Sequence, residues 1–378
     1  MQKGNWGLVT NAAARTREGI TNRQALIQEG WQLTCLFSPE HGLSAMGADG
    51  QAQAHHQDQE TGLPVYSLYG PQFGPTLRML ESLDGLLFDL PDVGVRFYTY
   101  VWTLSYLMEA CLEAEKSLVI LDRPNPLSGQ LALAEGPMLD ETQWSSFIGR
   151  WSIPVRHSLT LGELARYWQQ EKNMQQLELS VIACQGWQRW QYQTDTELPF
   201  IPPSPAINHP ETLLTYPALC FMEGVNVNEG RGTPFPFQQF GAPWLNGQQF
   251  AQILNGFGFT GVHFESCRFR PQTNRYVGQD CQGVRLVGIT PSDYRPVQTG
   301  IGILALLRLH YPEAAQWATY PTHANPLGTH HLDLLLGNSA IRLLLAQNPE
   351  QVLANLSTLT IAPDWEPRVA PFLIYADS

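Results

Sequence analysis

Four short apolar runs in the first third of the chain each end in polar side chains. The runs cover residues 7–10, 33–37, 85–88 and 118–121, and they lead into Asn11, Ser38-Pro39-Glu40-His41-Gly42, Asp89-Leu90-Pro91-Asp92 and Asp122-Arg123-Pro124-Asn125. Apolar runs of four or five residues separated by helical patterns are typical of buried parallel strands. In an open α/β sheet, ligands bind beyond the carboxyl ends of the strands. The four polar ends therefore predict one ligand-binding edge.

Strand and helix patterns alternate through the first half of the chain. Strands are expected at residues 6–10, 32–37, 85–89, 117–121 and 178–183, and helices at 21–29, 75–82, 98–114 and 160–171. This order is typical of βαβ units and predicts an α/β fold with a parallel sheet. Thr21-Asn22-Arg23-Gln24 and Thr160-Leu161-Gly162-Glu163 match the capping box, so helices should begin near Thr21 and Thr160.

Prolines mark the expected end of this domain. Residues 198–205 contain Pro199, Pro202, Pro203 and Pro205, which exclude a helix or a central strand. Beyond them, we expect helices after Asn246 and at 296–309, 339–347 and 351–356, and strands at 262–270 and 283–289. The mixed order predicts a second, smaller α+β domain. We therefore divide the chain into residues 1–200 and 201–378.

Charge and composition narrow the classes of partner. The formal net charge of −12, without a Lys/Arg cluster, argues against binding to nucleic acid or to an anionic membrane. No apolar run of 18 residues predicts a transmembrane segment, and the first residues show no secretory signal. The six scattered cysteines are expected to be mostly reduced and buried. His41, His55, His56, Asp89 and Asp92 lack metal-binding spacing, so neither a metal nor another cofactor is expected.

Glu40 is the first candidate for catalysis. It leaves an expected strand on the rigid Ser38-Pro39 dipeptide and is followed by Gly42, which permits a sharp turn. A carboxyl group held in this way could serve as a general acid if its pKa were raised. The alternative is a loop carboxylate that caps a helix or pairs with an Arg.

The segment from Asp89 to Tyr100 could supply several contacts to one ligand. Asp89 and Asp92 precede Arg96, Tyr98 and Tyr100. Arginine matches a carboxylate with its planar fork, and aromatic faces suit sugar rings. The alternative is an Asp–Arg pair that holds the loop, with a buried tyrosine in the next helix.

For two other polar segments, a purely structural role is about as well supported by the sequence as contact with a ligand. In residues 122–126 a structural pair of Asp122 and Arg123 is favoured, with Asn125 beside it. Glycines flank Arg231 in Glu229-Gly230-Arg231-Gly232-Thr233, so this stretch could approach a ligand closely or form a tight turn locked by a Glu–Arg pair. His157 is either a ligand-facing histidine or a loop residue, and Glu163 belongs to the helix cap.

With these residues in view, nearly the whole chain resembles the NamZ-type exo-β-N-acetylmuramidases, formerly a domain-of-unknown-function family. The motifs that carry the resemblance are GLVTN at 7–11, FSPEHG at 37–42, LPVYSLYG at 63–70, FDLPDVGVRFYTY at 88–100, LDRPNP at 121–126, EGRGT at 229–233 and GAPW at 241–244. The resemblance implies a Rossmann-like domain joined to a smaller auxiliary domain, with the active site in the cleft between them. It also implies hydrolytic release of N-acetylmuramic acid from the non-reducing ends of peptidoglycan fragments.

The resemblance gives roles to particular residues. Glu40 becomes the leading catalytic candidate, with His41 and Asp92 beside it. The expected substrate contacts are Asn11, Asp89, Arg96, Tyr98, Tyr100, Asp122, Arg123, Asn125, His157, Glu229 and Arg231. Glycoside hydrolysis needs an acid and a second group, which could be Asp89, Asp92, Glu229 or the substrate's own 2-acetamido oxygen. Arg96 or Arg231 is the hypothetical clamp for the lactyl carboxylate of muramic acid.

Some positions depart from the family pattern, and other functions stay open. Pro91 stands where the family usually has Gln, Ser158 replaces a common Gly, and Ala206 replaces an Asn. A protein that binds amino sugars without turnover would keep the same cleft. A nucleotide-binding Rossmann enzyme is disfavoured, since residues 10–14 lack the glycine-rich fingerprint. The family implies periplasmic or secreted action, whereas the sequence itself leaves a cytoplasmic location open.

Overall fold

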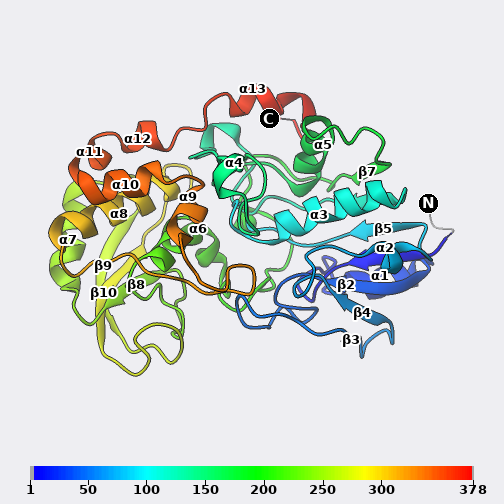
Figure 1. Cartoon of the computed structure of the whole chain (residues 1–378), viewed down its shortest axis with the longest axis horizontal. Coiled ribbons are helices and arrows are strands. Elements are labelled where there is room, and N and C mark those ends of the chain that lie inside the picture. The colour runs from blue at the N-terminus through cyan, green and yellow to red at the C-terminus, as the bar shows by residue number, and fades with distance from the viewer. Residues whose placement is uncertain (1–3, 377–378) are drawn as a thin grey trace.

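The computed structural model describes residues 4–376 and contains a mostly parallel seven-stranded sheet (Figure 1). The strand order is β3-β4-β2-β1-β5-β6-β7, and only the β3–β4 pair is antiparallel. The strands are β1 Trp6–Val9, β2 Leu33–Ser38, β3 His56–Gln57, β4 Pro64–Ser67, β5 Gly85–Phe88, β6 Ser117–Leu121 and β7 Leu179–Ile182. The four predicted apolar runs are thus the four central strands β2, β1, β5 and β6.

Helices connect these strands as the βαβ pattern predicts. They are α1 Asn22–Gln28, α2 Leu77–Leu80, α3 Tyr100–Glu113, α4 Glu141–Trp144 and α5 Leu161–Glu171. The predicted capping box at Thr160 and Glu163 is present. At α1 the capping box is wrong, because Thr21 makes no side-chain cap and donates its hydroxyl to Glu60 Oε2 at 3.0 Å instead.

A three-stranded antiparallel sheet forms the centre of the second, smaller unit. Its order is β8-β10-β9, with β8 Gln239–Ala242, β9 His263–Phe269 and β10 Cys281–Val287. The surrounding helices are α6 Pro210–Leu219, α7 Gly247–Phe257, α8 Pro296–His310, α9 His331–Leu336, α10 Ala340–Gln347, α11 Pro349–Ala354 and α12 Leu356–Leu359. Short 3-10 helices occur at 131–133, 193–195, 220–224 and 370–372. The predicted α+β arrangement is confirmed.

The last residues of the chain return to the first domain. Helix α13, Trp365–Val369, lies beside α5, and the red segment in Figure 1 follows this path. Trp365 Nε1 donates to the backbone oxygen of His157 at 2.9 Å, and Tyr375 donates to Asp122 Oδ2 at 2.8 Å. The C-terminal segment therefore fastens the second unit to the large sheet.

A buried carboxylate gives a further link between the two units. Glu135, in a loop after β6, accepts hydrogen bonds from the backbone N–H groups of Val297 at 3.3 Å and Gln298 at 2.9 Å. These N–H groups begin α8, where helix ends need acceptors. One apolar core runs from α3 and α5 into α6 and α8, so the units pack as one body.

Two further observations bear on the composition of the chain. All six cysteines are free, and four of them are buried. Across residues 4–376, the helices are either too short or too polar to cross a bilayer.

Candidate active site

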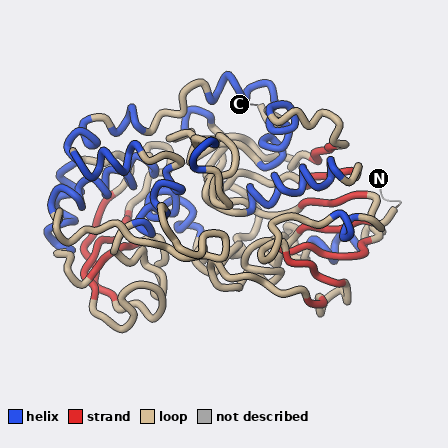
Figure 2. The backbone as a smooth tube through the Cα atoms, in the orientation of Figure 1, coloured by secondary structure: helices blue, strands red, loops and turns tan. Residues whose placement is uncertain are grey.

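A cavity of about 370 Å³ lies between the carboxyl edge of the large sheet and the second unit. Loops fill much of the region between the two groups of strands in Figure 2. The polar residues that line the cavity include Glu40, His41, Asp49, Thr99, Glu223, Arg231, Tyr320 and His331. The aromatic residues that line it include Tyr69, Phe97, Tyr98, Phe147, Tyr216 and Phe237. Both units contribute, so the cleft predicted from the sequence exists and is lined from both sides.

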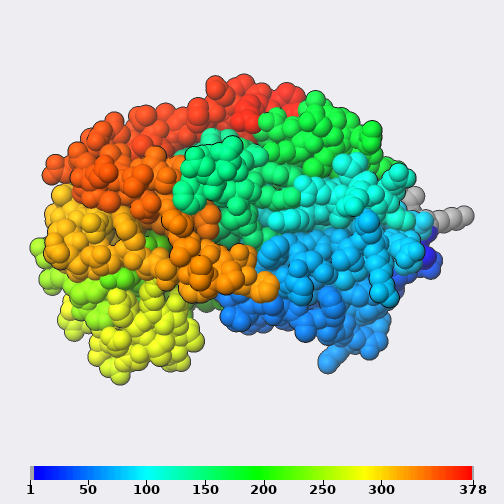
Figure 3. Space-filling view, in the orientation of Figure 1, coloured from blue at the N-terminus to red at the C-terminus, as the bar shows by residue number. Residues whose placement is uncertain are grey.

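Residues 319–330 of the second unit cover part of this cavity. His323 Nε2 donates to the backbone oxygen of Gly70 at 2.7 Å, and His323 N donates to the oxygen of Gly50 at 2.8 Å. In Figure 3 this orange segment lies against the blue residues of the first domain. The contacts join the two units beside the cavity, which Tyr320, Thr322 and Ala324 of this segment line.

Glu40 is a buried carboxyl group on the wall of the cavity. It follows β2, and its Oε1 accepts the Gly50 N–H at 2.9 Å while Oε2 accepts the Thr99 hydroxyl at 2.7 Å. Burial raises the pKa of Glu40, and the nearby charge of Asp49 raises it further. A carboxylic acid with a raised pKa keeps its proton to higher pH than usual and can donate it to a substrate.

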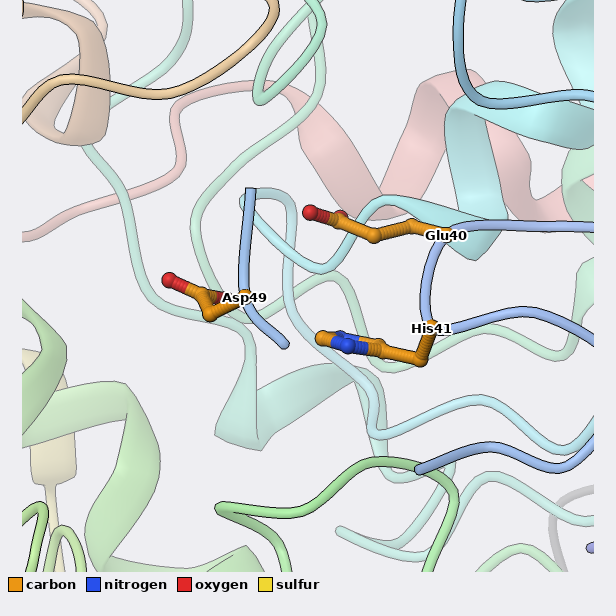
Figure 4. A group of neighbouring side chains, drawn as sticks. All are labelled: Glu40, His41 and Asp49. Atoms are coloured by element: carbon orange, nitrogen blue, oxygen red, sulfur yellow. The ribbon is translucent and has the colours of Figure 1, made fainter. Parts of the chain in front are cut away.

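His41 turns its ring toward the same space because its backbone adopts a left-handed conformation, with φ of 68°. Its Nδ1 lies 2.9 Å from the oxygen of Gly47 and must donate, since a carbonyl only accepts. An imidazole that carries its one hydrogen on Nδ1 presents Nε2 as an acceptor. Figure 4 shows the side chains of Glu40 and His41 directed toward Asp49.

Asp49 is a site residue that the sequence did not indicate. It lies in the loop after His41, its side chain is 36% exposed, and Oδ2 accepts the Tyr320 hydroxyl at 2.6 Å. Arg231 Nη2 is 3.2 Å from the same oxygen. Burial alone would raise the pKa of Asp49, but Arg231, His41 and Tyr320 hold it below its usual value. A lone Asp between Ala48 and Gly50 carries no motif that could have identified it.

Arg231 is surrounded by carboxylates. It bonds Glu223, and its Nη1 lies 3.0 Å from Glu229 Oε1, in addition to the contact with Asp49. The second oxygen of Glu223 accepts from His331 Nε2 at 2.8 Å. The predicted Glu–Arg pair at 229 and 231 is therefore real, and only Arg231 of the two lines the cavity. Glu223 and His331 were not identified from the sequence.

Glu40, His41 and Asp49 also lie close enough together for each to offer one ligand atom to a cation. One ligand atom from each lies within 4.8 Å of the others. Two carboxylates and an imidazole suit several divalent cations. The sequence did not predict this group, because Asp49 is absent from the motifs.

Of the predicted aromatic and basic contacts, Tyr98 and Arg231 line the cavity. Tyr100 lies behind Glu40, donating to the oxygen of Pro203 at 2.6 Å and accepting from Asn11 Nδ2 at 2.9 Å. Arg96 is fully buried and donates to the backbone oxygens of Pro137, Ile153 and Leu335. Arg96 as a substrate clamp is inconsistent with this placement, since its two terminal nitrogens already donate to protein backbone and the side chain does not line the cavity.

The remaining predicted residues support the strand ends rather than line the cavity. Arg123 pairs with Asp89 at 2.5 Å rather than with Asp122, which corrects the expected partner. Asp122 accepts from the Thr160 hydroxyl at 2.6 Å and from the Gly162 N–H at 2.8 Å, and burial raises its pKa to about 6. Asn125 donates to the oxygen of Leu159 at 2.8 Å.

Asp92 and His157 form a second buried pair outside the cavity. Asp92 Oδ2 lies 3.4 Å from His157 Nε2 and accepts the Gly94 N–H at 2.9 Å. This places Asp92 as a support of the loop rather than beside the cavity wall. Of the three departures from the family pattern, Ala206 lines the cavity, whereas Pro91 and Ser158 do not.

Comparisons with known proteins agree with both the fold and the motifs. Two family models match the chain: "Exo-beta-N-acetylmuramidase NamZ, N-terminal" over residues 6–211 and the corresponding C-terminal model over residues 214–375. The peptidoglycan β-N-acetylmuramidase NamZ of Bacillus subtilis strain 168 is 37% identical over 338 residues, which are 89% of this chain and 78% of that protein.

Two solved structures share the whole fold. Both are DUF1343 family proteins from Bacteroides fragilis NCTC 9343. The first has a TM-score of 0.86 at 29% identity and covers 99% of this chain and 95% of its own. The second has a TM-score of 0.74 at 26% identity and covers 100% of this chain and 95% of its own.

Proposed function

This chain belongs to the exo-β-N-acetylmuramidase NamZ family, and on that premise we propose that it hydrolyses peptidoglycan fragments with Glu40 as the general acid. The product is N-acetylmuramic acid released from the non-reducing end. The observation that carries the proposal is the buried Glu40 carboxyl group on the cavity wall, with its raised pKa. Cleavage of a glycosidic bond requires an acid that protonates the leaving oxygen.

The shape and lining of the cavity support attack at a chain end. A volume of about 370 Å³ is at the small end of ligand sites and suits one sugar ring with its substituents. Tyr69, Tyr98 and Phe147 offer aromatic faces to such a ring. Because residues 319–330 cover the site, a terminal sugar can enter more easily than an internal one.

Arg231 is the cavity residue that we propose as the contact for the lactyl carboxylate of muramic acid. It is the one Arg or Lys in the described lining, and its planar fork suits a carboxylate. Asp49, Glu223 and Glu229 already share its charge. The lactyl carboxylate would join them at the guanidinium, with the contact between Arg231 and Asp49 kept.

The proposal is tested with the full chain and chromogenic N-acetylmuramides. Wild-type protein should hydrolyse these substrates. Glu40→Gln should lower kcat by about 10²- to 10⁴-fold and should still bind free N-acetylmuramic acid. The loss should be smaller for a dinitrophenyl leaving group, which needs little protonation, than for the natural disaccharide. Asp280→Asn, an exposed carboxylate paired with Arg270, is the matched control.

Two results would contradict the proposal. Equal losses with good and poor leaving groups would remove Glu40 as the general acid. Wild-type protein that binds amino sugars but hydrolyses none of them would instead be a binding protein.

A further inference from the structure

The cavity contains a carboxylate that can act together with Glu40. Asp49 presents an oxygen within 4.8 Å of a Glu40 oxygen, and both residues line the cavity. Figure 4 shows the two residues as neighbours. Glycoside hydrolysis needs a second group close to the reacting carbon. Asp49 lies close enough to Glu40 to be that group.

The other acids in the region are occupied or lie elsewhere. Asp89, Asp92 and Glu229 do not line the cavity. Glu223 does, but its two oxygens are bonded to Arg231 and His331. Asp49 therefore remains as the partner of Glu40 among the carboxylates of residues 4–376 that line the cavity.

Side chains of the second unit hold Asp49 in place through one oxygen. Tyr320 donates its hydroxyl to Oδ2 at 2.6 Å, and Arg231 lies 3.2 Å from the same atom. The bonds that the structure describes for this carboxylate thus leave Oδ1 for a ligand. An oriented anion with a fixed geometry stabilises developing positive charge without reorganisation.

We propose that Asp49 is the second catalytic carboxylate and accepts the N–H of the substrate's 2-acetamido group while the acetamido oxygen attacks the anomeric carbon. This inference rests on the proposed hydrolase function. Asp49 is suited to this role more than to direct attack, because Arg231 and Tyr320 draw on its electron density and weaken it as a nucleophile. Its fixed negative charge instead stabilises the positive charge that develops on the acetamido nitrogen.

The reaction proceeds in two balanced steps. In the first, a bond forms between the acetamido oxygen and the anomeric carbon, and the glycosidic bond breaks. The leaving oxygen takes the electron pair of that bond and the proton of Glu40, and Asp49 supports the resulting oxazolinium ring. In the second step water attacks the anomeric carbon, the ring bond breaks toward the acetamido oxygen, and Glu40 takes a proton from the water.

The first experiment changes the attacking oxygen. Chromogenic muramides with N-acetyl, N-fluoroacetyl and N-trifluoroacetyl groups are compared with wild-type protein. If the acetamido oxygen attacks, kcat/KM falls at least about tenfold from acetyl to trifluoroacetyl, since fluorine withdraws electrons from the nucleophile. Equal kcat/KM values across the series would overturn attack by the substrate.

The second experiment changes Asp49. Asp49→Asn should lower kcat by about 10²- to 10³-fold with the fold retained. It should also move the basic limb of the pH profile to lower pH, because the charge that helps to hold the proton on Glu40 is gone. Tyr320→Phe, which keeps the carboxylate but removes one of its bonds, should lower kcat by less.

The outcomes separate this inference from the proposed function. Active wild-type protein, inactive Glu40→Gln and fully active Asp49→Asn would overturn the role of Asp49 alone. Wild-type protein without turnover of any muramide would overturn both. Asp280→Asn makes the same chemical change at an exposed site and should leave kcat and the pH profile unchanged.

Discussion

Thr99 donates its hydroxyl hydrogen bond to Glu40 Oε2 across 2.7 Å, from the position directly before α3. This bond favours the ionised carboxylate and lowers the pKa of Glu40, against the effects of burial and of Asp49. The acidity of Glu40 therefore depends on its burial and on several neighbours, among them the residue that precedes a helix and a loop residue.

Replacing Thr99 by Val should raise the pKa of Glu40, because the shape is kept and the hydrogen bond is lost. A general acid is active when protonated, so kcat/KM falls as the pH rises through its pKa. The basic limb should therefore move to higher pH. The measurement is a pH profile of kcat/KM. A shift to lower pH, as expected for Asp49→Asn, would contradict this account.

Arg231→Lys should impair muramyl substrates more than glucosaminyl ones. Lysine keeps the charge beside Asp49, Glu223 and Glu229 but loses the planar fork. We expect KM for muramides to rise by about tenfold or more relative to that for the matching glucosaminides. Equal changes in both KM values would show that Arg231 organises its carboxylates without contacting the lactyl group.

Arg96→Lys should damage stability rather than specificity. The guanidinium satisfies three backbone carbonyls in the core, and burial lowers its pKa to about 9. A lysine cannot reach all three in the same directions, and each buried acceptor left alone costs about 1–3 kcal/mol. Denaturant unfolding should show a loss of about 2–5 kcal/mol, with Arg78→Lys on the surface as control. A change in the ratio of the KM for muramyl substrates to the KM for glucosaminyl substrates would instead support Arg96 as the clamp.

Tyr375→Phe should loosen the C-terminal segment from the sheet. The tyrosine hydroxyl donates to Asp122 Oδ2 at 2.8 Å, and a hydrogen bond to a carboxylate contributes about 1–3 kcal/mol. The expected result is a lower Tm with kcat preserved. In a double-mutant cycle, the same change in an Asp122→Asn background should cost less, since the charged acceptor has already been removed. Equal costs in both backgrounds would mean that the ring packing, and not this bond, holds the segment.

The four central strands were predictable because a buried strand appears in the sequence as a short run of apolar residues. Four apolar runs became β1, β2, β5 and β6, and the Thr160 capping box was confirmed. Short or irregular elements have no such apolar pattern in the sequence. Strand β3 has two residues, and α6 begins at Pro210 and contains Pro217, so neither shows a clear period.

The polar strand ends were predictable as a group but not individually. Glu40 reaches the cavity, whereas Asp89 and Asp122 turn to Arg123 and Thr160. The partner with which a polar side chain forms a hydrogen bond depends on its distances to residues of neighbouring segments in the folded protein. A pattern along one strand does not contain those distances.

The sequence by itself determined the α/β architecture and the family and made Glu40 the first candidate for catalysis, because apolar periodicity and long motifs are properties of consecutive residues. Only the tertiary structure selected Asp49 and removed Arg96 from the substrate contacts. The position and charge of Asp49 depend on its contacts with Arg231 and with Tyr320, which is 271 residues away along the chain. Arg96 is committed to backbone oxygens that folding brings around it. Charge, burial and hydrogen bonding act through space, so the roles of these two residues were decided by packing.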